Sequence, residues 1–215
     1  MTVDERVIIK KVVEEVVKRI NGNGEEAYVP IGISNRHIHL SQKDLEILFG
    51  QGYKLTKMKD LKQPGQFAAK ETVKIIGPKG FFEGVRILGP VRPETQVEIS
   101  LSDGFKLGLS APVRESGKTE DTPSFIIEGP KGSVEKKQGV IAALRHIHIP
   151  PTFADKFRLK DKELVNVEID GIRKLVYHNV LIRVSDQFEL EMHLDMDEAN
   201  AGGISNGDLA KILKG

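Results

Sequence analysis

Hydrophobic residues follow two different periods along this chain, with the change near residue 21. Before it, apolar side chains recur at helical spacing between lysines and glutamates. They are Ile8, Ile9, Val12, Val13, Val16, Val17 and Ile20. One apolar stripe on a charged background predicts an amphipathic helix at the N-terminus. The stretch NGNGEE that follows predicts a flexible linker, so we expect this helix to be tethered to the body of the protein.

Beyond the linker, apolar and polar residues alternate over short segments rich in valine, isoleucine and phenylalanine. Turn sequences such as GPKG, SDG, ESGK and EGPKG separate these segments. Alternation at period two with closely spaced turns predicts a mainly β protein, either a sandwich or a barrel. The most loop-like interior stretch is residues 115–124, which we expect to form a mobile loop near the functional site.

One motif occurs twice, as NRHIHL at residues 35–40 and as LRHIHI at residues 144–149. The chain has six histidines, and four of them belong to these two copies. They are His37, His39, His146 and His148. Because residues i and i+2 of a strand point to the same side, the two histidines of each copy are expected to share one face.

A third, partial copy is FELEMHLD, at residues 188–195. His193 aligns with the second histidine of the other copies, and Glu191 takes the place of the first. Neutral imidazoles suit zinc and similar transition metals. A single His-x-His pair is usually a pair of surface or hydrogen-bonded histidines, but the registered copies favour a metal site. His178 belongs to no copy and is expected to have a structural role.

Each copy continues into a segment that predicts a short helix. Ser41 with Asp44 predicts a capping box, and residues 150–152 (PPT) predict a helix start. Residues 195–198 (DMDE) bring acid into a first helical turn, and Gly202–Gly203 ends that helix. The repeated unit is therefore predicted to be a strand with polar ligands, a helical cap and a turn.

Polar residues also alternate along GPVRPETQVEIS, at residues 89–100. One side carries Arg92, Glu94, Gln96, Glu98 and Ser100, and the other side, which we expect to face the core, carries Thr95, Val97, Ile99 and Leu101. A strand with one polar face is usually only solvated. An arginine and a carboxylate beside histidines could instead bind an oxyanion and complete a metal shell, because a guanidinium group matches phosphate geometry.

Composition narrows the possible chemistry. The chain has no cysteine, which excludes disulfides, thiolate nucleophiles and cysteine-based zinc sites. The formal net charge is only +1, so no global field would recruit nucleic acid or a membrane surface. No apolar run approaches the roughly 20 residues of a membrane span, and no signal-peptide pattern is present. We therefore expect a soluble, cytoplasmic protein with no nucleic-acid or membrane partner.

Five motifs in order, RHIHL, QPGQFAAKETV, GPVRPETQVEIS, RHIHIP and FELEMHLDMDEANA, resemble those of the PduL-type phosphotransacylases, also called phosphate propanoyltransferases. The resemblance runs from about Val29 to the C-terminus. It implies an enzyme that interconverts acyl-CoA plus phosphate with acyl phosphate plus CoA. It also implies two β-barrels with short capping helices, with a two-zinc site between them. Their connectivity is swapped: residues 26–35 and 144–215 form one barrel, and residues 36–143 form the other.

The resemblance also implies residue roles. One zinc falls to His37, His39 and Glu98. The second zinc, or another divalent metal, falls to His146, His148 and His193. Arg92 corresponds to the phosphate-binding arginine and is the expected catalytic residue. The positions that contact CoA correspond to Ser34, Lys59, Arg86, Leu88, His193 and Asn200.

We also expect a homodimer, and the family implies a role for the N-terminal segment, residues 1–25. In the family such a helix can act as an encapsulation peptide that binds cargo or shell partners of a bacterial microcompartment. The equally weighted alternative is a helix packed on its own barrel or on a dimer partner.

Two other functions use the same residue types. A zinc hydrolase of thioesters or phosphate esters would not need phosphate as an acceptor, and a non-catalytic metal-binding protein would show no turnover. The dependence of thiol release on phosphate distinguishes all three functions.

Overall fold

The structure is a computed structural model that describes residues 26–213. The amphipathic helix predicted for the N-terminal segment lies outside the described residues. Those residues form fifteen strands and four short helices, which confirms the predicted mainly β fold. Within the same range, no helix has the length and apolar character needed to cross a membrane.

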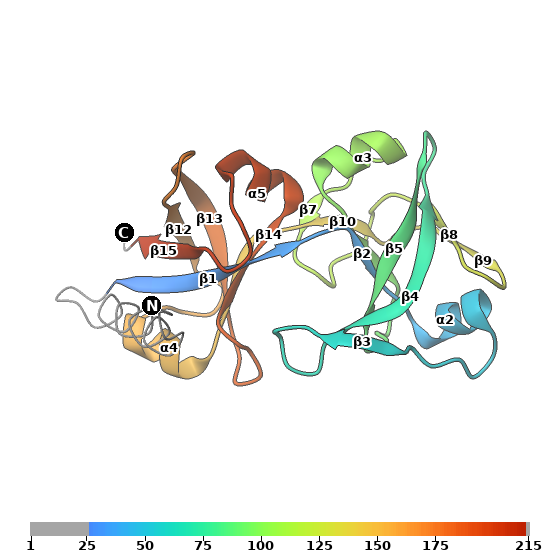
Figure 1. The fold of residues 1–215 in the computed structure, drawn as a ribbon, viewed down its shortest axis with the longest axis horizontal. Coiled ribbons are helices and arrows are strands. Elements are labelled where there is room, and N and C mark those ends of the chain that lie inside the picture. Colours follow the sequence, from blue (N-terminus) through green and yellow to red (C-terminus); the bar gives the residue numbers. More distant parts are fainter. Residues whose placement is uncertain (1–25, 214–215) are drawn as a thin grey trace, which may run out of the picture.

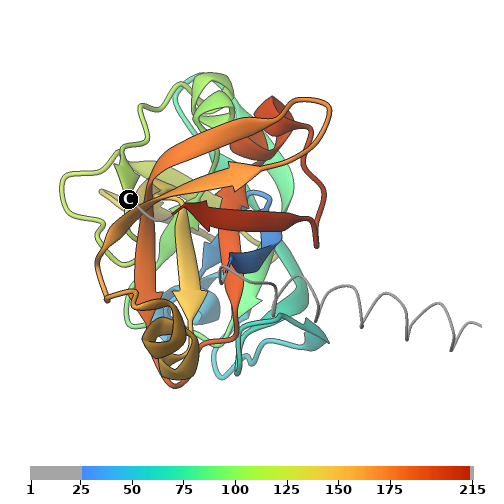
Figure 2. The same cartoon turned by 90° about the vertical axis from the view of Figure 1, so that its left-hand side faces the viewer.

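The left-hand part of Figure 1 is a closed six-stranded barrel, in the order β1-β14-β11-β13-β12-β15. Its strands are β1 (Ala27–Ser34), β11 (His146–Ile149), β12 (Leu164–Ile169), β13 (Leu175–Val184), β14 (Glu191–Asp195) and β15 (Leu209–Leu213). β1 closes the barrel by running parallel to β14 and antiparallel to β15. Figure 2 views this barrel from its outer side, with the orange and red C-terminal strands towards the reader.

The other part is a nine-stranded sheet in the order β7-β10-β6-β2-β5-β4-β8-β9, with β3 paired to β4. Its strands are β2 (His37–His39), β3 (Lys57–Asp60), β4 (Phe67–Ile76), β5 (Phe81–Gly89), β6 (Gln96–Glu98), β7 (Val113–Arg114), β8 (Phe125–Glu128), β9 (Ser133–Lys136) and β10 (Val140–Ala143). This sheet curls into a half-barrel, whereas the barrel formed with β1 is closed.

The chain passes between the two parts twice. β1 belongs to the barrel, whereas β2, which follows almost at once, belongs to the open sheet. The chain returns between β10 and β11, as the swapped connectivity predicts. Each part has its own hydrophobic core, and the two buried clusters share no residue. The assignment of the two parts as separate domains stays a prediction.

The four helices are α2 (Gln42–Phe49), α3 (Leu101–Leu107), α4 (Pro151–Phe157) and α5 (Met196–Gly202). Three of the four helices begin where the caps predict, and α3 was not predicted. α5 begins with a complete capping box between Asp195 and Glu198, and its C-cap Gly203 has the left-handed conformation that glycine tolerates. In α4, Pro151 occupies the first helical turn.

The capping box predicted for α2 is only half formed. The Ser41 hydroxyl accepts from the backbone N–H of Asp44, as predicted. The Ser41 backbone N–H, however, donates to Thr95 Oγ1 over 2.8 Å. The Asp44 carboxylate accepts from Thr95 and Lys136. Aspartate is one methylene shorter than the glutamate that usually completes this motif, so Thr95 bridges the two groups.

The polar strand predicted for residues 92–100 is shorter than expected. β6 covers only Gln96–Glu98, and Ser100 is already the N-cap of α3. Thr95, Val97 and Ile99 are buried, as the alternation predicts, but Leu101 is 49% exposed. The prediction for Leu101 was wrong because the helix begins there, and its period replaces that of the strand.

Candidate functional site

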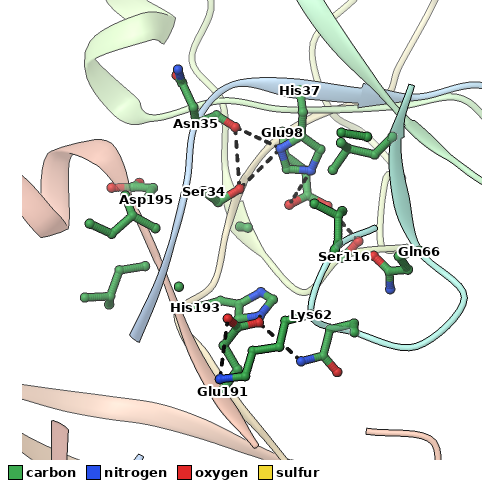
Figure 3. Close-up of a pocket in the computed structure, with 18 of the residues that line it drawn as sticks. Ser34, Asn35, His37, Lys62, Gln66, Glu98, Ser116, Glu191, His193 and Asp195 are labelled. Carbon is green, nitrogen blue, oxygen red and sulfur yellow. Dashed lines mark hydrogen bonds and ion pairs between the residues drawn. The ribbon is translucent and has the colours of Figure 1, made fainter. Parts of the chain in front are cut away.

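A cavity of about 690 Å³ lies where the barrel meets the open sheet. Strands β1, β2, β5, β11, β13 and β14 all contribute to its lining, and so does the loop between β3 and β4. Both histidine motifs line it. Figure 3 shows His37 and Glu98 on one side of this cavity and His193 and Glu191 on the other.

The first ligand group lies on the open sheet. His37 and His39 come from β2, and Glu98 from the neighbouring antiparallel strand β6, where it stands directly opposite His37. Nε2 of His37 is 3.5 Å from one Glu98 carboxylate oxygen, and Nε2 of His39 is 4.0 Å from the other. One ligand atom from each of the three residues falls within 4.8 Å of the others, so the group could hold a metal ion.

The second ligand group repeats this arrangement in the barrel. His146 and His148 come from β11, and His193 stands opposite His146 on the antiparallel strand β14. The His193 ring centroid is 4.9 Å from the ring centroids of both other histidines. Ligand atoms from all three again lie within 4.8 Å of one another. Each group therefore combines a His-x-His strand with a third ligand directly across the ladder.

The third ligands also reveal a fourth copy of the repeat. Each helix begins three residues after a ligand: α2 after His39, α3 after Glu98, α4 after His148 and α5 after His193. An apolar residue and an N-cap stand between ligand and helix in every case. The Glu98 copy was missed because its ligand is a carboxylate. The available signal was EISLSD, residues 98–103, in which the ligand is followed by an apolar residue, the N-cap Ser100 and an acid three residues after that cap.

Backbone carbonyl groups orient the first histidine of each pair. Nδ1 of His37 lies 2.9 Å from the carbonyl oxygen of Asn35. Nδ1 of His146 lies 2.8 Å from the carbonyl oxygen of Leu144. A ring N–H donated from Nδ1 leaves the lone pair of Nε2 free for a metal. The same local contact therefore prepares one ligand in each group.

The chemistry of the donor atoms fits a transition metal. Both ring nitrogens of His148 are buried and have no hydrogen-bond partner, which is costly unless another group satisfies one of them. Burial lowers the pKa of His39 to about 3, of His146 to about 4 and of His148 to about 2, with neighbouring histidines adding to the shift. These imidazoles are thus neutral at neutral pH, which is the form that binds metal.

Glu98 completes the first group as a carboxylate. Burial favours its neutral form, but His37 and His39, a hydrogen bond from Ser116 and the charge of Arg92 outweigh burial and lower its pKa to about 2. An ionised oxygen ligand beside neutral nitrogen ligands is a donor set that zinc accepts.

Arg92 lies beside this group, as the sequence analysis expected. It lines the cavity, and Nη1 donates to the Ser116 hydroxyl over 3.0 Å. Ser116 in turn donates to Glu98 over 2.8 Å. Ser116 belongs to the predicted loop at residues 115–124, so the structure places part of that loop at the site. The contribution of Ser116 to the hydrogen bonds of the site was not apparent from the sequence.

A second arginine at the cavity was missed. Arg183 of β13 stands in register with His148 of the parallel strand β11, so both face the same side. It lines the cavity, and its guanidinium carbon lies 5.5 Å from the centroid of the Phe188 ring. Its side chain makes no hydrogen bond or ion pair with another described residue. No motif marks this position, because β13 contributes a single residue to the site.

Most of the expected CoA positions surround the same cavity. Ser34, Lys59, Arg86, Leu88 and His193 line it. Asn200 lies outside this lining, on the exposed side of α5. The assignment of these residues to CoA stays a prediction.

His178 is not among the residues that line the cavity, and its structural role stays a prediction. It is exposed, its Nδ1 lies 2.9 Å from Oδ1 of Asn166, and its carbonyl oxygen accepts hydrogen bonds from Arg145.

Comparisons with known proteins agree with the geometry. A family model described as phosphate propanoyltransferase matches residues 30–205. A protein of that name from Thermotoga maritima is 55% identical over 191 residues, covering 88% of this chain and 91% of its own. Proteins of the same name from Clostridioides difficile and Rhodopseudomonas palustris are 51% and 53% identical, covering 96% and 86% of this chain and 98% and 82% of theirs. The chain therefore belongs to the phosphate propanoyltransferase family and is a phosphate acyltransferase.

Proposed function

We propose that this enzyme interconverts a short-chain acyl-CoA, propanoyl-CoA or acetyl-CoA, plus phosphate with the acyl phosphate plus CoA, using two zinc ions. A different divalent metal at the second group is part of the proposal. The observation that carries it is the convergence of two complete ligand groups and Arg92 on one cavity of about 690 Å³. That volume is in the range of small-molecule sites.

Within this proposal, His37, His39 and Glu98 would hold one metal, and His146, His148 and His193 the other. Bound metal would supply Lewis-acid stabilisation for negative charge on reacting oxygen or sulfur atoms. The neutral imidazoles of His39, His146 and His148 and the ionised carboxylate of Glu98 support this assignment, because these ligands need no further deprotonation near neutral pH.

The guanidinium group of Arg92 would bind and orient the phosphate. In the forward reaction a phosphate oxygen attacks the thioester carbonyl carbon, a C–O bond forms, and the C–S bond breaks to release the CoA thiolate. The chain offers no cysteine for an acyl-enzyme, so direct attack by phosphate is the simplest route. Ser116 fixes the position of Arg92 relative to Glu98. Arg183 would add a second positive charge from the barrel side.

CoA would approach the cavity past Lys59 and Arg86, whose charges suit its phosphate groups. Arg86 donates to the carbonyl oxygens of Ala69 and Lys70, over 3.0 and 2.8 Å, which places its guanidinium group at the edge of β4. Lys59 is exposed on β3, which leaves its ammonium group free to meet an anion.

The test follows free thiol and acyl phosphate during incubation of acetyl-CoA or propanoyl-CoA, with and without phosphate. Transfer predicts thiol release that depends on phosphate, with one acyl phosphate formed per thiol. Thiol release without phosphate would identify a hydrolase, and no release would identify a non-catalytic protein. Chelation should abolish the transfer, and zinc or cobalt should restore it.

We also propose that residues 1–25 serve as an encapsulation peptide, so that the enzyme works in the cytoplasm inside a bacterial microcompartment. The amphipathic sequence pattern of this segment is what supports the proposal. Removing residues 1–22 should leave catalysis intact and abolish co-purification with shell proteins. A large loss of thermal stability would instead favour a helix packed on the enzyme. The expected homodimer can be tested by sedimentation equilibrium.

A further inference from the structure

The third ligand of each group has a polar neighbour two residues earlier on its own strand. In β6, Nε2 of Gln96 donates to a Glu98 carboxylate oxygen over 2.7 Å. In β14, Nε2 of His193 lies 2.8 Å from a Glu191 carboxylate oxygen. Because strand residues at i and i+2 share a face, each neighbour stands beside its ligand. The two ligand groups therefore match in this outer contact as well.

The direction of the hydrogen bond reverses between the two groups. Glu98 is an ionised carboxylate and can only accept, and its neighbour is an amide that donates. His193 is an imidazole with a ring N–H to donate, and its neighbour is a carboxylate that accepts. When the third ligand changes from acceptor to donor, the neighbour changes from donor to acceptor. Residues that are only solvated would not be expected to match donor to acceptor with the third ligand in both groups.

Further contacts fix the orientation of Gln96. Its side chain is buried, at 2% exposure. Oε1 accepts from the backbone N–H of Gly117 over 2.7 Å, so the amide must present Nε2 to Glu98 and to the Ser116 hydroxyl. The donor therefore remains directed at the ligand carboxylate.

Glu191 is fixed from three sides. Oε2, which faces His193, also accepts from Nε2 of Gln63 over 3.3 Å, and Oε1 lies 3.9 Å from Nζ of Lys62. On the third side, β1 presents a glycine: a Cβ atom at Gly32 would lie 2.6 Å from Oε1 of Glu191. The absent side chain leaves room for the carboxylate beside His193.

We propose that Gln96 and Glu191 are matched positioning residues, each of which sets the orientation of one metal ligand. Gln96 holds the Glu98 carboxylate at the first group. Glu191 accepts a hydrogen bond from Nε2–H of His193 and leaves the Nδ1 lone pair free for the metal at the second group. Such outer contacts commonly change metal affinity by about 10- to 100-fold. The inference rests on the proposed metal sites. It predicts that Gln96 affects only the first site and that Glu191 affects only the second.

The test measures cobalt and zinc affinity by competition with a chromophoric chelator, and records the cobalt absorption spectrum. Glu191→Gln and Gln96→Ala are compared in two one-metal backgrounds, His37→Ala and His146→Ala. We expect Glu191→Gln to weaken binding about 10- to 100-fold and to alter the cobalt spectrum where only the second group remains. Gln96→Ala should have the same effects in His146→Ala, where only the first group remains. Glu191→Gln should leave metal affinity unchanged in His146→Ala, and Gln96→Ala should leave it unchanged in His37→Ala.

Two further variants make this test specific. Gly32→Ala leaves every ligand and neighbour in place but pushes against the Glu191 carboxylate, so it should reproduce the effect of Glu191→Gln. Gln42→Ala removes an amide–carboxylate hydrogen bond of the same kind, 2.9 Å from Nε2 to Oε1 of Glu46, on the exposed face of α2. This control should leave both affinities unchanged.

The outcomes separate the two levels of inference. Unchanged affinity and spectrum in Glu191→Gln and Gln96→Ala would overturn the positioning roles while the metal sites stand. Equal weakening of both groups by either variant would also overturn them, because it would indicate general loosening of the fold. Failure of the unmodified protein to bind metal would refute the proposed function and this inference with it.

Discussion

The two ligand groups share a backbone plan but differ in charge. Both place two histidines on one strand and a third ligand directly opposite the first histidine. The open-sheet group has a carboxylate as its third ligand, and the barrel group has an imidazole. A divalent ion would therefore keep one net positive charge at the first group and two at the second. Metal ions bound to the two groups would therefore differ in electrophilicity.

Their surroundings differ as well. The open-sheet group meets polar partners, since Arg92 and Ser116 are linked to Glu98. In the barrel, the Phe188 ring stacks on His148 with centroids 4.1 Å apart and an angle of 28° between the planes. An apolar cover strengthens electrostatic interactions by excluding water. The first group is thus better placed to position an anion. At the second group, the exclusion of water strengthens the electrostatic interactions of a bound metal ion.

Removing one histidine from each half should have the largest effect. His37→Ala and His146→Ala should each lose one metal per chain, because two ligands seldom replace three. Turnover should fall by more than the roughly 10- to 100-fold loss that is typical when a residue that only orients a metal ligand is changed. Metal analysis and phosphate-dependent thiol release measure both effects. His178→Ala, an exposed histidine outside both groups, is the control that should keep both metals. Full turnover in either ligand variant would show that its group is not catalytic.

Arg92 tests whether the phosphate is held from the open-sheet side. Arg92→Ala should lower turnover by about 10²–10³, since a charge-assisted contact to a reacting oxyanion is lost. Arg92→Lys should recover only part of the rate, because an ammonium group cannot reproduce a bidentate guanidinium. Both variants should keep their metals. Phosphate titrations with parallel metal analysis measure this effect.

Arg183 is the arginine that lines the cavity from the barrel side, and its substitution can be compared with that of Arg92. The Arg183 side chain has no hydrogen bond within the described part of the chain, so Arg183→Gln disrupts little structure. We expect a higher KM for phosphate and a smaller loss of turnover than in Arg92→Ala. Equal losses in the two variants would contradict the assignment of phosphate mainly to the open-sheet side.

The attachment of α2 should give an effect on stability alone. Thr95 is 2% exposed, receives the Ser41 backbone N–H and donates to Asp44. Thr95→Val keeps the shape but leaves these groups unpaired, which should cost about 1–3 kcal/mol of unfolding free energy. Thr95→Ser retains the hydroxyl and should cost less. Urea unfolding of both variants measures the difference, and an unchanged midpoint in Thr95→Val would show that water replaces these bonds.

The smallest expected effect concerns an ion pair between the halves. Lys118 and Lys162, the latter from the barrel side, donate to Glu115 and lower its pKa from 4.5 to about 2. A carboxylate with a lowered pKa stabilises the fold above about pH 4.5, and that contribution disappears as the pH falls towards 2. Glu115→Gln should therefore cost less than about 1 kcal/mol at pH 7, and almost nothing near pH 2. Urea unfolding at both pH values tests this, and a cost that persists in acid would exclude the ion pair as its cause.

Local patterns in the sequence determined much of this protein. The registered His-x-His pairs identified four of the six candidate ligands, because i and i+2 share a face in any strand. The caps at Ser41 and Asp195 and the proline at Pro151 predicted where three helices begin, since capping depends on neighbours within one turn. The half-barrel shape of the nine-stranded sheet was not predicted. Whether a sheet closes into a barrel depends on whether its two edge strands pair, and these strands lie far apart in the sequence.

Tertiary structure decided which side chains meet across the chain. The antiparallel ladders place Glu98 opposite His37 and His193 opposite His146, and no local rule specifies such long-range register. Arg183 reaches the cavity only because β13 runs beside β11. The sequence by itself determined the ligand types, the strand faces and the helix starts, because these depend on nearby residues. Their assembly around one cavity depended on strand pairing between segments far apart in sequence, which only the tertiary structure decides.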